Sequence, residues 1–236
     1  MIDGVRALVF DVFGTVVDWR SSIIADLEAF GRAKNLKADW VGLTDAWRAG
    51  YQPAMDRVRS GELGWTHIDV LHRTVLDRLL VEFKVAGLSE ADKGHVNRVW
   101  HRLKGWPDAV EGLTRLKRKF IISTLSNGNT SLLVNMAKFA GLPWDCVLSA
   151  ETFKAYKPDP RAYLGAAEIL GLEPAEVMMV AAHNSDLVAA SKQGLRTAFV
   201  ARPSEYGPHQ TKDLKAEHTF DFVATSFVDL AAQTGA

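Results

Sequence analysis

The chain has 236 residues, with 28 lysines and arginines against 28 aspartates and glutamates, 47% hydrophobic residues and 24% charged residues. Disorder requires low hydrophobicity and high net charge, so this composition excludes an intrinsically disordered chain. The zero net charge argues against a protein that binds nucleic acids or membrane surfaces through a basic excess. The single cysteine, Cys146, excludes an intramolecular disulfide framework and a cysteine-based zinc site.

The sequence shows no segment for membrane insertion or secretion. No apolar stretch reaches the roughly 20 residues that span a bilayer, and no signal peptide is visible near the N-terminus. We therefore expect a soluble, cytoplasmic protein. Its length suits one large domain, or a core domain with a smaller companion.

Short apolar runs that end in polar or glycine-containing turns recur along the chain and predict strands buried on both faces. They cover residues 5–10, 120–125, 146–148, 177–182, 197–200 and 222–224. Between them, helical patterns that end near a glycine cover residues 130–139, 161–170 and 187–192. Strands that alternate with helices of this length predict an α/β fold with a parallel sheet.

Residues 21–102 differ from the rest, because they carry helix-period patterns and no convincing strand. So many helical residues after the first strand exceed a single crossover connection. We interpret them as a helical subdomain over the carboxyl edge of the sheet. The predicted division is a Rossmann-like core of residues 1–17 and 103–236 and a helical cap of residues 18–102.

Polar residues follow several predicted strands, at the sheet edge where α/β proteins bind ligands. Asp11 follows the first strand, Ser126 the second and His183 a later one, while Lys157 follows the strand at 146–148. A carboxylate such as Asp11 can act as a nucleophile when a nearby cation keeps it ionised. Taken alone, Asp11 is better explained as the cap of a helix or turn. The convergence of a lysine and two polar loops favours a site.

Four motifs occur in order along nearly the whole chain. They read DVFGT from Asp11, LSNG from Leu125, YKPD from Tyr156, and a loop that contains Asp186. Each is short, but their order and their places after strands resemble the haloacid dehalogenase superfamily. The resemblance implies a doubly wound, parallel, Rossmann-like α/β core with an inserted helical cap.

The superfamily consists mostly of phosphatases, so individual residues decide the branch. Those phosphatases carry a general acid two positions after the nucleophile, where this chain has Phe13. They also carry an acidic metal ligand four positions before Asp186, where this chain has Ala182. Phe13 and the pair Trp47–Arg48 are similar to the L-2-haloacid dehalogenase branch. A Mg²⁺-dependent small-molecule phosphatase is the alternative.

The resemblance to this branch implies hydrolysis of short 2-haloacids to 2-hydroxy acids through a covalent ester on Asp11, without a metal or a cofactor. Lys157 would keep Asp11 ionised, Asp186 would orient Lys157 or the water, and Thr15 would hydrogen-bond the Asp11 carboxylate. The other expected roles are substrate carboxylate binding by Ser126 and nearby N–H groups, halide stabilisation by Arg48 and Asn127, and pocket contacts by Phe13, Tyr163 and Trp19.

The fourth motif departs from the branch pattern of Ser-Ser-Asn, because Ala181 removes a hydroxyl and His183 stands at the asparagine position. An imidazole titrates near neutral pH, so His183 is either a general base for ester hydrolysis or a polar wall of the pocket. We include His183 among the catalytic candidates.

The expected partner is a small 2-haloacid, with no nucleic acid and no membrane, and the family resemblance suggests a homodimer. An interaction protein that keeps the fold without turnover is a further alternative. It has no need for the combination of Asp11, Thr15, Ser126, Lys157 and Asp186.

Overall fold

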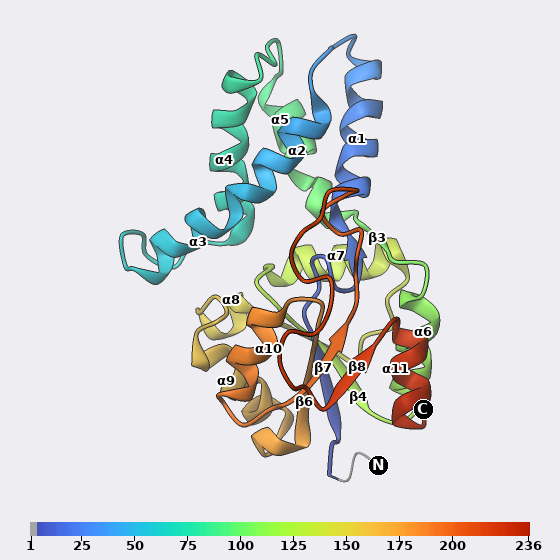
Figure 1. Ribbon diagram of the computed structural model, residues 1–236. Coiled ribbons are helices and arrows are strands. Elements are labelled where there is room, and N and C mark those ends of the chain that lie inside the picture. Colours follow the sequence, from blue (N-terminus) through green and yellow to red (C-terminus); the bar gives the residue numbers. More distant parts are fainter. Residues whose placement is uncertain (1–3) are drawn as a thin grey trace.

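The computed structural model describes residues 4–236, so residues 1–3 of the predicted core lie outside the described residues. Its centre is a six-stranded sheet in the order β5-β4-β1-β6-β7-β8, with every neighbouring pair parallel (Figure 1). The strands are β1 (Ala7–Phe10), β4 (Ile121–Ser126), β5 (Cys146–Ser149), β6 (Val177–Ala181), β7 (Arg196–Val200) and β8 (Phe222–Ala224). Each coincides with one predicted apolar run, and the predicted α/β fold is confirmed.

Alternating side chains of the central strands enter two separate hydrophobic layers. Leu8 and Phe10 of β1 join one cluster, whereas Ala7 and Val9 join the other. The first layer is covered by α6 (Ala109–Lys117), α7 (Thr130–Ala140) and α11 (Phe227–Thr234), and the second by α9 (Pro160–Leu170) and α10 (Asn184–Ser191). Because both faces are covered, the central strands β1 and β6 are apolar throughout.

The predicted helix at residues 187–192 begins earlier in the structure. Helix α10 starts at Asn184, with His183 in an extended conformation as its N-cap residue. Its first turn consists of Asn184, Ser185 and Asp186, which are polar and therefore gave no apolar periodicity. The difference matters because Asp186 is a first-turn residue of a helix rather than part of a free loop.

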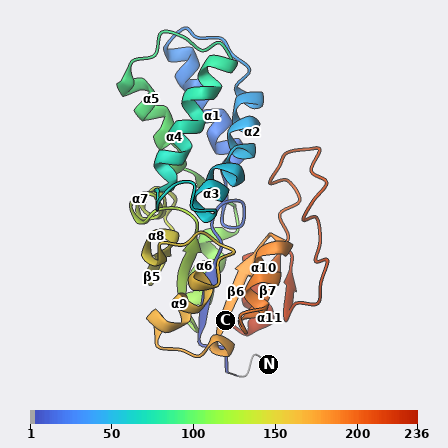
Figure 2. The ribbon, with the colours of Figure 1, turned by 90° about the vertical axis from the view of Figure 1, so that its left-hand side faces the viewer.

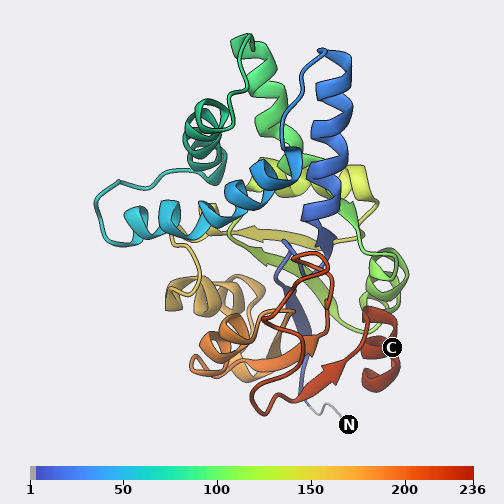
Figure 3. The ribbon, with the colours of Figure 1, turned by 45° about the horizontal axis from the view of Figure 1, so that its top comes forward.

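The helices between residues 19 and 101 stand above the carboxyl ends of the sheet (Figures 1 and 3). They are α1 (Trp19–Ala33), α2 (Trp40–Ala49), α3 (Tyr51–Arg59), α4 (Ile68–Glu82), α5 (Glu90–Asn97) and the short 3₁₀ helix η1 (Arg98–His101). The chain enters and leaves this region through β2 (Val17–Asp18) and β3 (Lys104–Gly105), which pair antiparallel. We call this region the cap and propose that its limits are residues 18 and 102, as expected from the sequence.

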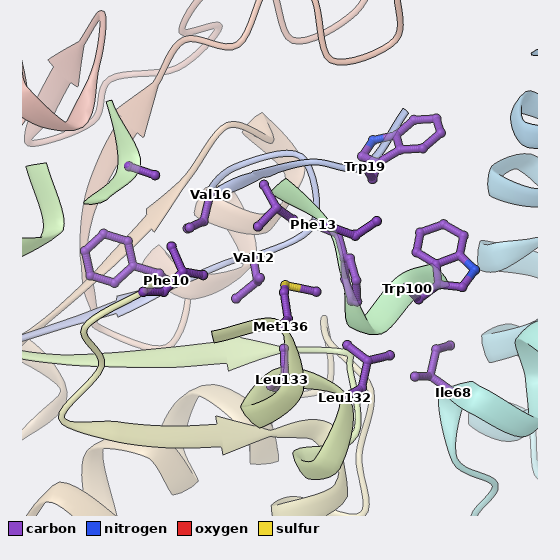
Figure 4. Close-up of a cluster of buried hydrophobic side chains, with 14 of the residues drawn as sticks. Phe10, Val12, Phe13, Val16, Trp19, Ile68, Trp100, Leu132, Leu133 and Met136 are labelled. Carbon is purple, nitrogen blue, oxygen red and sulfur yellow. The ribbon is translucent and has the colours of Figure 1, made fainter. Parts of the chain in front are cut away.

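Aromatic residues pack where the cap meets the core. The rings of Phe13 and Trp100 meet edge to face with centroids 5.7 Å apart, and Trp19 stacks on Trp100 at 6.4 Å (Figure 4). Both sides of this contact belong to one continuous hydrophobic cluster. Aromatic rings bury a large area each, so this packing holds the cap over the sheet edge.

Residues 201–221 connect β7 to β8 without a helix or strand. Figure 2 shows this segment as a long irregular excursion beside the sheet and the cap, and we call it the β7–β8 loop. Arg202 anchors its start, because its guanidinium binds both Asp108 carboxylate oxygens and the Thr15 carbonyl. Long irregular loops in compact domains are commonly functional.

Two short connecting elements complete the chain, namely α8 (Ala150–Phe153) after β5 and the 3₁₀ helix η2 (Pro174–Glu176) before β6. Among residues 4–236, no helix has the length and apolar character needed to cross a bilayer.

Candidate active site

Asp11 lies at the carboxyl end of β1, where the strand order passes from β4 on one side to β6 on the other. Ligands bind at such switch points in open α/β sheets. Asp11 Oδ2 accepts a hydrogen bond from Thr15 Oγ1 at 2.8 Å, and the Ala182 N–H donates to Thr15 Oγ1 at 2.9 Å. The carboxylate is therefore held between the ends of β1 and β6.

Lys157 supplies the buried cation beside Asp11. Its Nζ lies 3.1 Å from Asp11 Oδ1 and also binds Asp186 Oδ2. Burial alone would raise the pKa of Asp11, but the charges of Lys157 and His183 outweigh burial and hold that pKa well below its ordinary value. Burial would also lower the pKa of Lys157, yet Asp11 and Asp186 outweigh it and raise that pKa. Asp11 is thus a carboxylate near neutral pH.

Two polar residues at the carboxyl end of β4, Ser126 and Asn127, hold backbone groups. Asn127 Oδ1 accepts a hydrogen bond from the Lys157 N–H at 2.7 Å, and Asn127 Nδ2 donates to the Lys157 carbonyl at 3.4 Å. The Ser126 hydroxyl accepts a hydrogen bond from the Gly128 N–H at 3.2 Å. Arg59 of α3 also donates to the Lys157 carbonyl. The lysine is positioned from both the core and the cap.

Asp186 belongs to the site through Lys157 and Tyr163. Its Oδ2 binds Lys157 Nζ, and its Oδ1 accepts a hydrogen bond from the Tyr163 hydroxyl at 2.6 Å. Burial, and then the charge of Asp186, raise the pKa of Tyr163 well above its ordinary value. Tyr163 is therefore a neutral donor, and both carboxylate oxygens of Asp186 already have a donor.

His183 bridges two carboxylates at the end of β6. Its Nδ1 lies 3.2 Å from Asp11 Oδ2, and its Nε2 lies 2.9 Å from Glu205 Oε2. Burial would lower the pKa of His183, but Glu205 and Asp11 outweigh burial and raise it well above 6.5. An imidazolium has a donor on each nitrogen, which matches two carboxylate partners.

Glu205, in the β7–β8 loop, was missed by the sequence analysis. It is 1% exposed and accepts a hydrogen bond from Trp19 Nε1 at 3.0 Å, while Arg48 Nη2 lies 3.9 Å away. Burial would raise the pKa of Glu205, but His183 outweighs burial and lowers it. The sequence offered one weak signal, which is that Glu205 follows a predicted strand. An acidic residue in a polar segment is otherwise expected to be exposed to solvent.

The position of Glu205 depends on Gly14. Gly14 has φ +87°, and a Cβ built on it would lie 2.0 Å from Glu205 Oε1. Only glycine combines that backbone conformation with so close an approach. The glycine of the first motif therefore makes room for an acid almost two hundred residues later in the chain.

A cavity of about 190 Å³ opens beside Asp11. Of the predicted site residues, it is lined by Asp11, Phe13, Arg48, Asn127, Lys157, Tyr163, His183 and Asp186, and by others that include Tyr51, Gln52, Tyr206, Lys212 and Asp213. Thr15, Ser126 and Trp19 do not line it. Thr15 hydrogen-bonds Asp11, the Trp19 ring lies against Arg48, and Ser126 accepts a hydrogen bond from the Gly128 N–H. The cavity is small and polar, and Tyr51 of the cap contributes an aromatic ring to its lining.

Arg48 of α2 brings a cation to this cavity from the cap. Its guanidinium carbon lies 4.6 Å from the Tyr51 ring centroid and 5.4 Å from that of Trp19. Arg48 Nη1 is buried and has no hydrogen-bond partner within residues 4–236. Buried polar atoms are normally paired, so this N–H group is a candidate binding point for an anion.

Metal-binding side chains are not gathered at the site. Across the part of the chain that the structure describes, no group of three His, Cys, Asp or Glu side chains has an arrangement that could hold a metal ion. The ammonium of Lys157 is the cation that contacts both Asp11 and Asp186.

Known proteins share both the sequence and the fold. A family model of haloacid dehalogenase-like hydrolases matches residues 5–194. The (S)-2-haloacid dehalogenase 4A of Burkholderia cepacia is 31% identical over 222 residues, which cover 87% of this chain and 88% of that protein.

Solved structures of similar proteins superpose over nearly the whole chain. The L-2-haloacid dehalogenase PA0810 has a TM-score of 0.96 and 51% identity, covering 98% of this chain and 99% of that one. The defluorinating L-2-haloacid dehalogenase Rha0230 has a TM-score of 0.95 and 49% identity, covering 98% and 96%. The four motifs, the fold and these similarities agree, and the chain belongs to the haloacid dehalogenase-like hydrolases.

Proposed function

We propose that this hydrolase removes halide from short 2-haloacids and forms 2-hydroxy acids through a covalent ester on Asp11. The observation that carries the proposal is an ionised carboxylate, paired with Lys157, that faces a cavity of about 190 Å³ with the cation of Arg48 in its wall. The volume suits a molecule of a few heavy atoms. The similar proteins described above are named for the same reaction.

In the first step, an Asp11 oxygen attacks carbon 2 of the substrate and forms a C–O bond, while the carbon–halogen bond breaks and its electron pair leaves with the halide. Thr15 and Lys157 hold the carboxylate in place for this attack. A positioned nucleophile avoids much of the entropy cost of a bimolecular encounter. In the second step, water attacks the ester carbonyl carbon, which releases the 2-hydroxy acid and restores Asp11.

Arg48 is the best-placed group for the negative charge that develops on the halide. Its Nη1 is buried without a partner among residues 4–236 and lies in the cavity wall. The Asn127 side chain already hydrogen-bonds both backbone groups of Lys157, so we assign it to positioning rather than to the halide. Preformed donors aimed at developing charge lower the barrier most in a site that excludes water.

The phosphatase alternative has less support. Phe13 packs edge to face against Trp100 and Tyr51 in the position of the phosphatase general acid. A hydrocarbon ring cannot protonate an alkoxide leaving group. A halide needs no proton, so Phe13 at this position fits halide displacement better than phosphate transfer.

We further propose that the protein is a homodimer. An apolar groove lies between α2, α3 and α4, and its lining includes Ala46, Ala54, Leu71 and Leu79. Exposed apolar grooves commonly mark association sites. Sedimentation at several protein concentrations tests this proposal, and a monomer at all concentrations would contradict it. The cytoplasmic location stays a prediction from the sequence.

The reaction is tested by halide release from chloroacetate and 2-chloropropionate, with EDTA present and with the variant Asp11→Asn. We expect release by the wild type and none by the variant, because an amide is a poor nucleophile. Asp77→Asn, which changes a surface aspartate of α4 in an ion pair with Arg73, is the matched control and should keep full activity. Halide release by Asp11→Asn, or none by the wild type, would contradict the proposal.

A further inference from the structure

Glu205 and His183 form a hydrogen-bonded acid–imidazole pair that reaches Asp11. Glu205 binds the Nε2 side of the ring at 2.9 Å, and the Nδ1 side faces Asp11 Oδ2 at 3.2 Å. An acid that orients an imidazole, with its other nitrogen at the reacting group, is the general arrangement for base catalysis. Trp19 Nε1 and Gly14 hold Glu205 where it can act on the imidazole.

Asp186 is poorly suited to activate the hydrolytic water. Its two oxygens are occupied by Lys157 Nζ and by the Tyr163 hydroxyl. The neighbouring residues Ala181 and Ala182 carry no polar side chain. His183 is the titratable group with a ring nitrogen directed at Asp11.

We propose that His183, positioned by Glu205, is the general base that hydrolyses the Asp11 ester, and that formation of the ester converts it from an acid into a base. The inference rests on the proposed function, since it concerns the second half of that reaction. Glu205 is a positioning residue, because it acts through His183 and does not line the cavity.

The conversion follows from the charges in contact with His183. In the free enzyme, two carboxylates face the ring, and their charges raise the pKa of His183 well above 6.5. When Asp11 becomes an ester, its charge disappears at 3.2 Å from Nδ1, and Glu205 is the carboxylate that stays in contact. Removal of a contacting anion lowers the pKa of an imidazolium. The proton on Nδ1 is then released to water.

The proton count of the two steps balances. Ester formation releases the halide, and His183 then loses one proton to solvent. Water attacks the ester carbonyl carbon while Nδ1 takes one of the two protons of the water. The bond between that carbon and the substrate oxygen then breaks, and the second proton of the water passes to the substrate oxygen, so that the product leaves as the 2-hydroxy acid. One proton remains on His183 beside the restored Asp11 carboxylate, so the overall reaction of haloacid and water yields hydroxy acid, halide and one proton.

The other charged groups near His183 come from several elements. The Lys157 ammonium is paired with Asp11 and with Asp186. The Arg48 guanidinium lies 3.9 Å from the Glu205 carboxylate. Lys212 and Asp213 of the β7–β8 loop line the same cavity. None of these groups forms a bond to the substrate in the first step, so the change at His183 comes from Asp11.

The first experiment separates the two half-reactions in Glu205→Gln and His183→Asn. Chloroacetate is mixed with each enzyme, chloride is measured over time, and intact-protein mass spectrometry measures the ester. We expect both variants to release about one chloride per active site and then to accumulate ester, with hydrolysis slowed about 10²-fold or more. Glu217→Gln, an exposed glutamate of the same loop, is the control and should not accumulate ester.

The second experiment measures the pH dependence of ester hydrolysis in single turnovers. In the wild type the rate should rise with pH through the pKa of His183 in the ester form. In Glu205→Gln that rise should move to lower pH, because loss of a contacting anion lowers the pKa of His183. In His183→Asn the rise should vanish. A purely structural role of Glu205 would slow hydrolysis without moving the pH profile.

The outcomes distinguish this inference from the proposed function. No chloride from the wild type would overturn the function itself. Chloride release with wild-type hydrolysis rates in both variants would overturn only the role of the Glu205–His183 pair. A hydrolysis rate that falls as pH rises would also overturn it, because His183 would then act as a cation. The chloride burst measures the number of folded active sites, so a misfolded variant is recognised because it gives no burst.

Discussion

Two groups of residues meet at Asp11, and they differ in how they are held. Thr15, Lys157 and Asp186 come from segments that follow strands or begin a helix of the core, and the sheet brings them together. Glu205 and Arg48 come from the β7–β8 loop and the cap, neither of which belongs to the sheet. We call these the core group and the outer group.

The core group and the outer group contribute differently to the two steps of the proposed reaction. The core group keeps Asp11 ionised and aligned, which both steps require. The outer group contributes a cation for the departing halide and, through His183, the carboxylate that positions the base. Changes in the core group should therefore damage every step and the fold, whereas changes around Glu205 should damage one step.

The largest effect is expected from Lys157→Met. Loss of the ammonium leaves Asp11 and Asp186 buried without their shared cation. Breaking a buried ion pair from one side costs about 3–5 kcal/mol of unfolding free energy. Halide release should fall by at least about 10²-fold. Urea unfolding and a chloride assay measure the two effects, with Lys138→Met on the surface of α7 as control. Unchanged halide release would remove Lys157 from the mechanism.

An intermediate effect is expected from Gly14→Ala. The new Cβ would lie 2.0 Å from Glu205 Oε1, at a backbone φ of +87°. We expect a loss of about 1–3 kcal/mol of unfolding free energy from backbone strain, and ester accumulation because Glu205 is displaced.

Gly141→Ala is the matched control for Gly14→Ala, since it has φ +68° and no atom within 4 Å of its added Cβ. It shares the backbone strain but not the displacement of Glu205. Ester accumulation in both variants, or in neither, would show that the contact with Glu205 has no catalytic consequence.

The smallest effect is expected in the pH dependence of stability. Because the pKa of His183 is raised in the folded protein, its contribution to stability is fully present below 6.5 and is lost as pH rises through the folded-state pKa. The pKa of Asp11 is lowered, so its contribution is present above 3.8 and is lost only as pH falls below that value. The wild type should therefore lose unfolding free energy toward alkaline pH.

Urea unfolding at a series of pH values from about 5 to about 9 measures this dependence. His183→Asn should lack the part of the alkaline loss that comes from the imidazolium. Parallel curves for the wild type and the variant would mean that His183 is not charged between Asp11 and Glu205.

Much of the core group could be predicted from the sequence. Asp11 and Lys157 follow apolar runs that predict buried strands. The carboxyl ends of parallel strands meet at one edge of the sheet, which brings these two residues together. The partners of individual side chains were harder to predict. The substrate and halide contacts expected of Ser126 and Asn127 stay predictions, and the hydrogen bonds of their side chains to the backbone of Gly128 and Lys157 were not foreseen. Spacing along the chain does not reveal which neighbour a side chain bonds.

The sequence by itself determined the α/β class, the strand positions, the helical cap and the residues at the strand ends, because each depends on local periodicity and short motifs. Only the tertiary structure decided that Glu205 is buried against His183 and Trp19, and that Gly14 makes room for it. The β7–β8 loop has no periodicity, so nothing local marks which of its polar residues turns inward. Its start is fixed by hydrogen bonds from Arg202 to Asp108 and Thr15, which are distant in sequence.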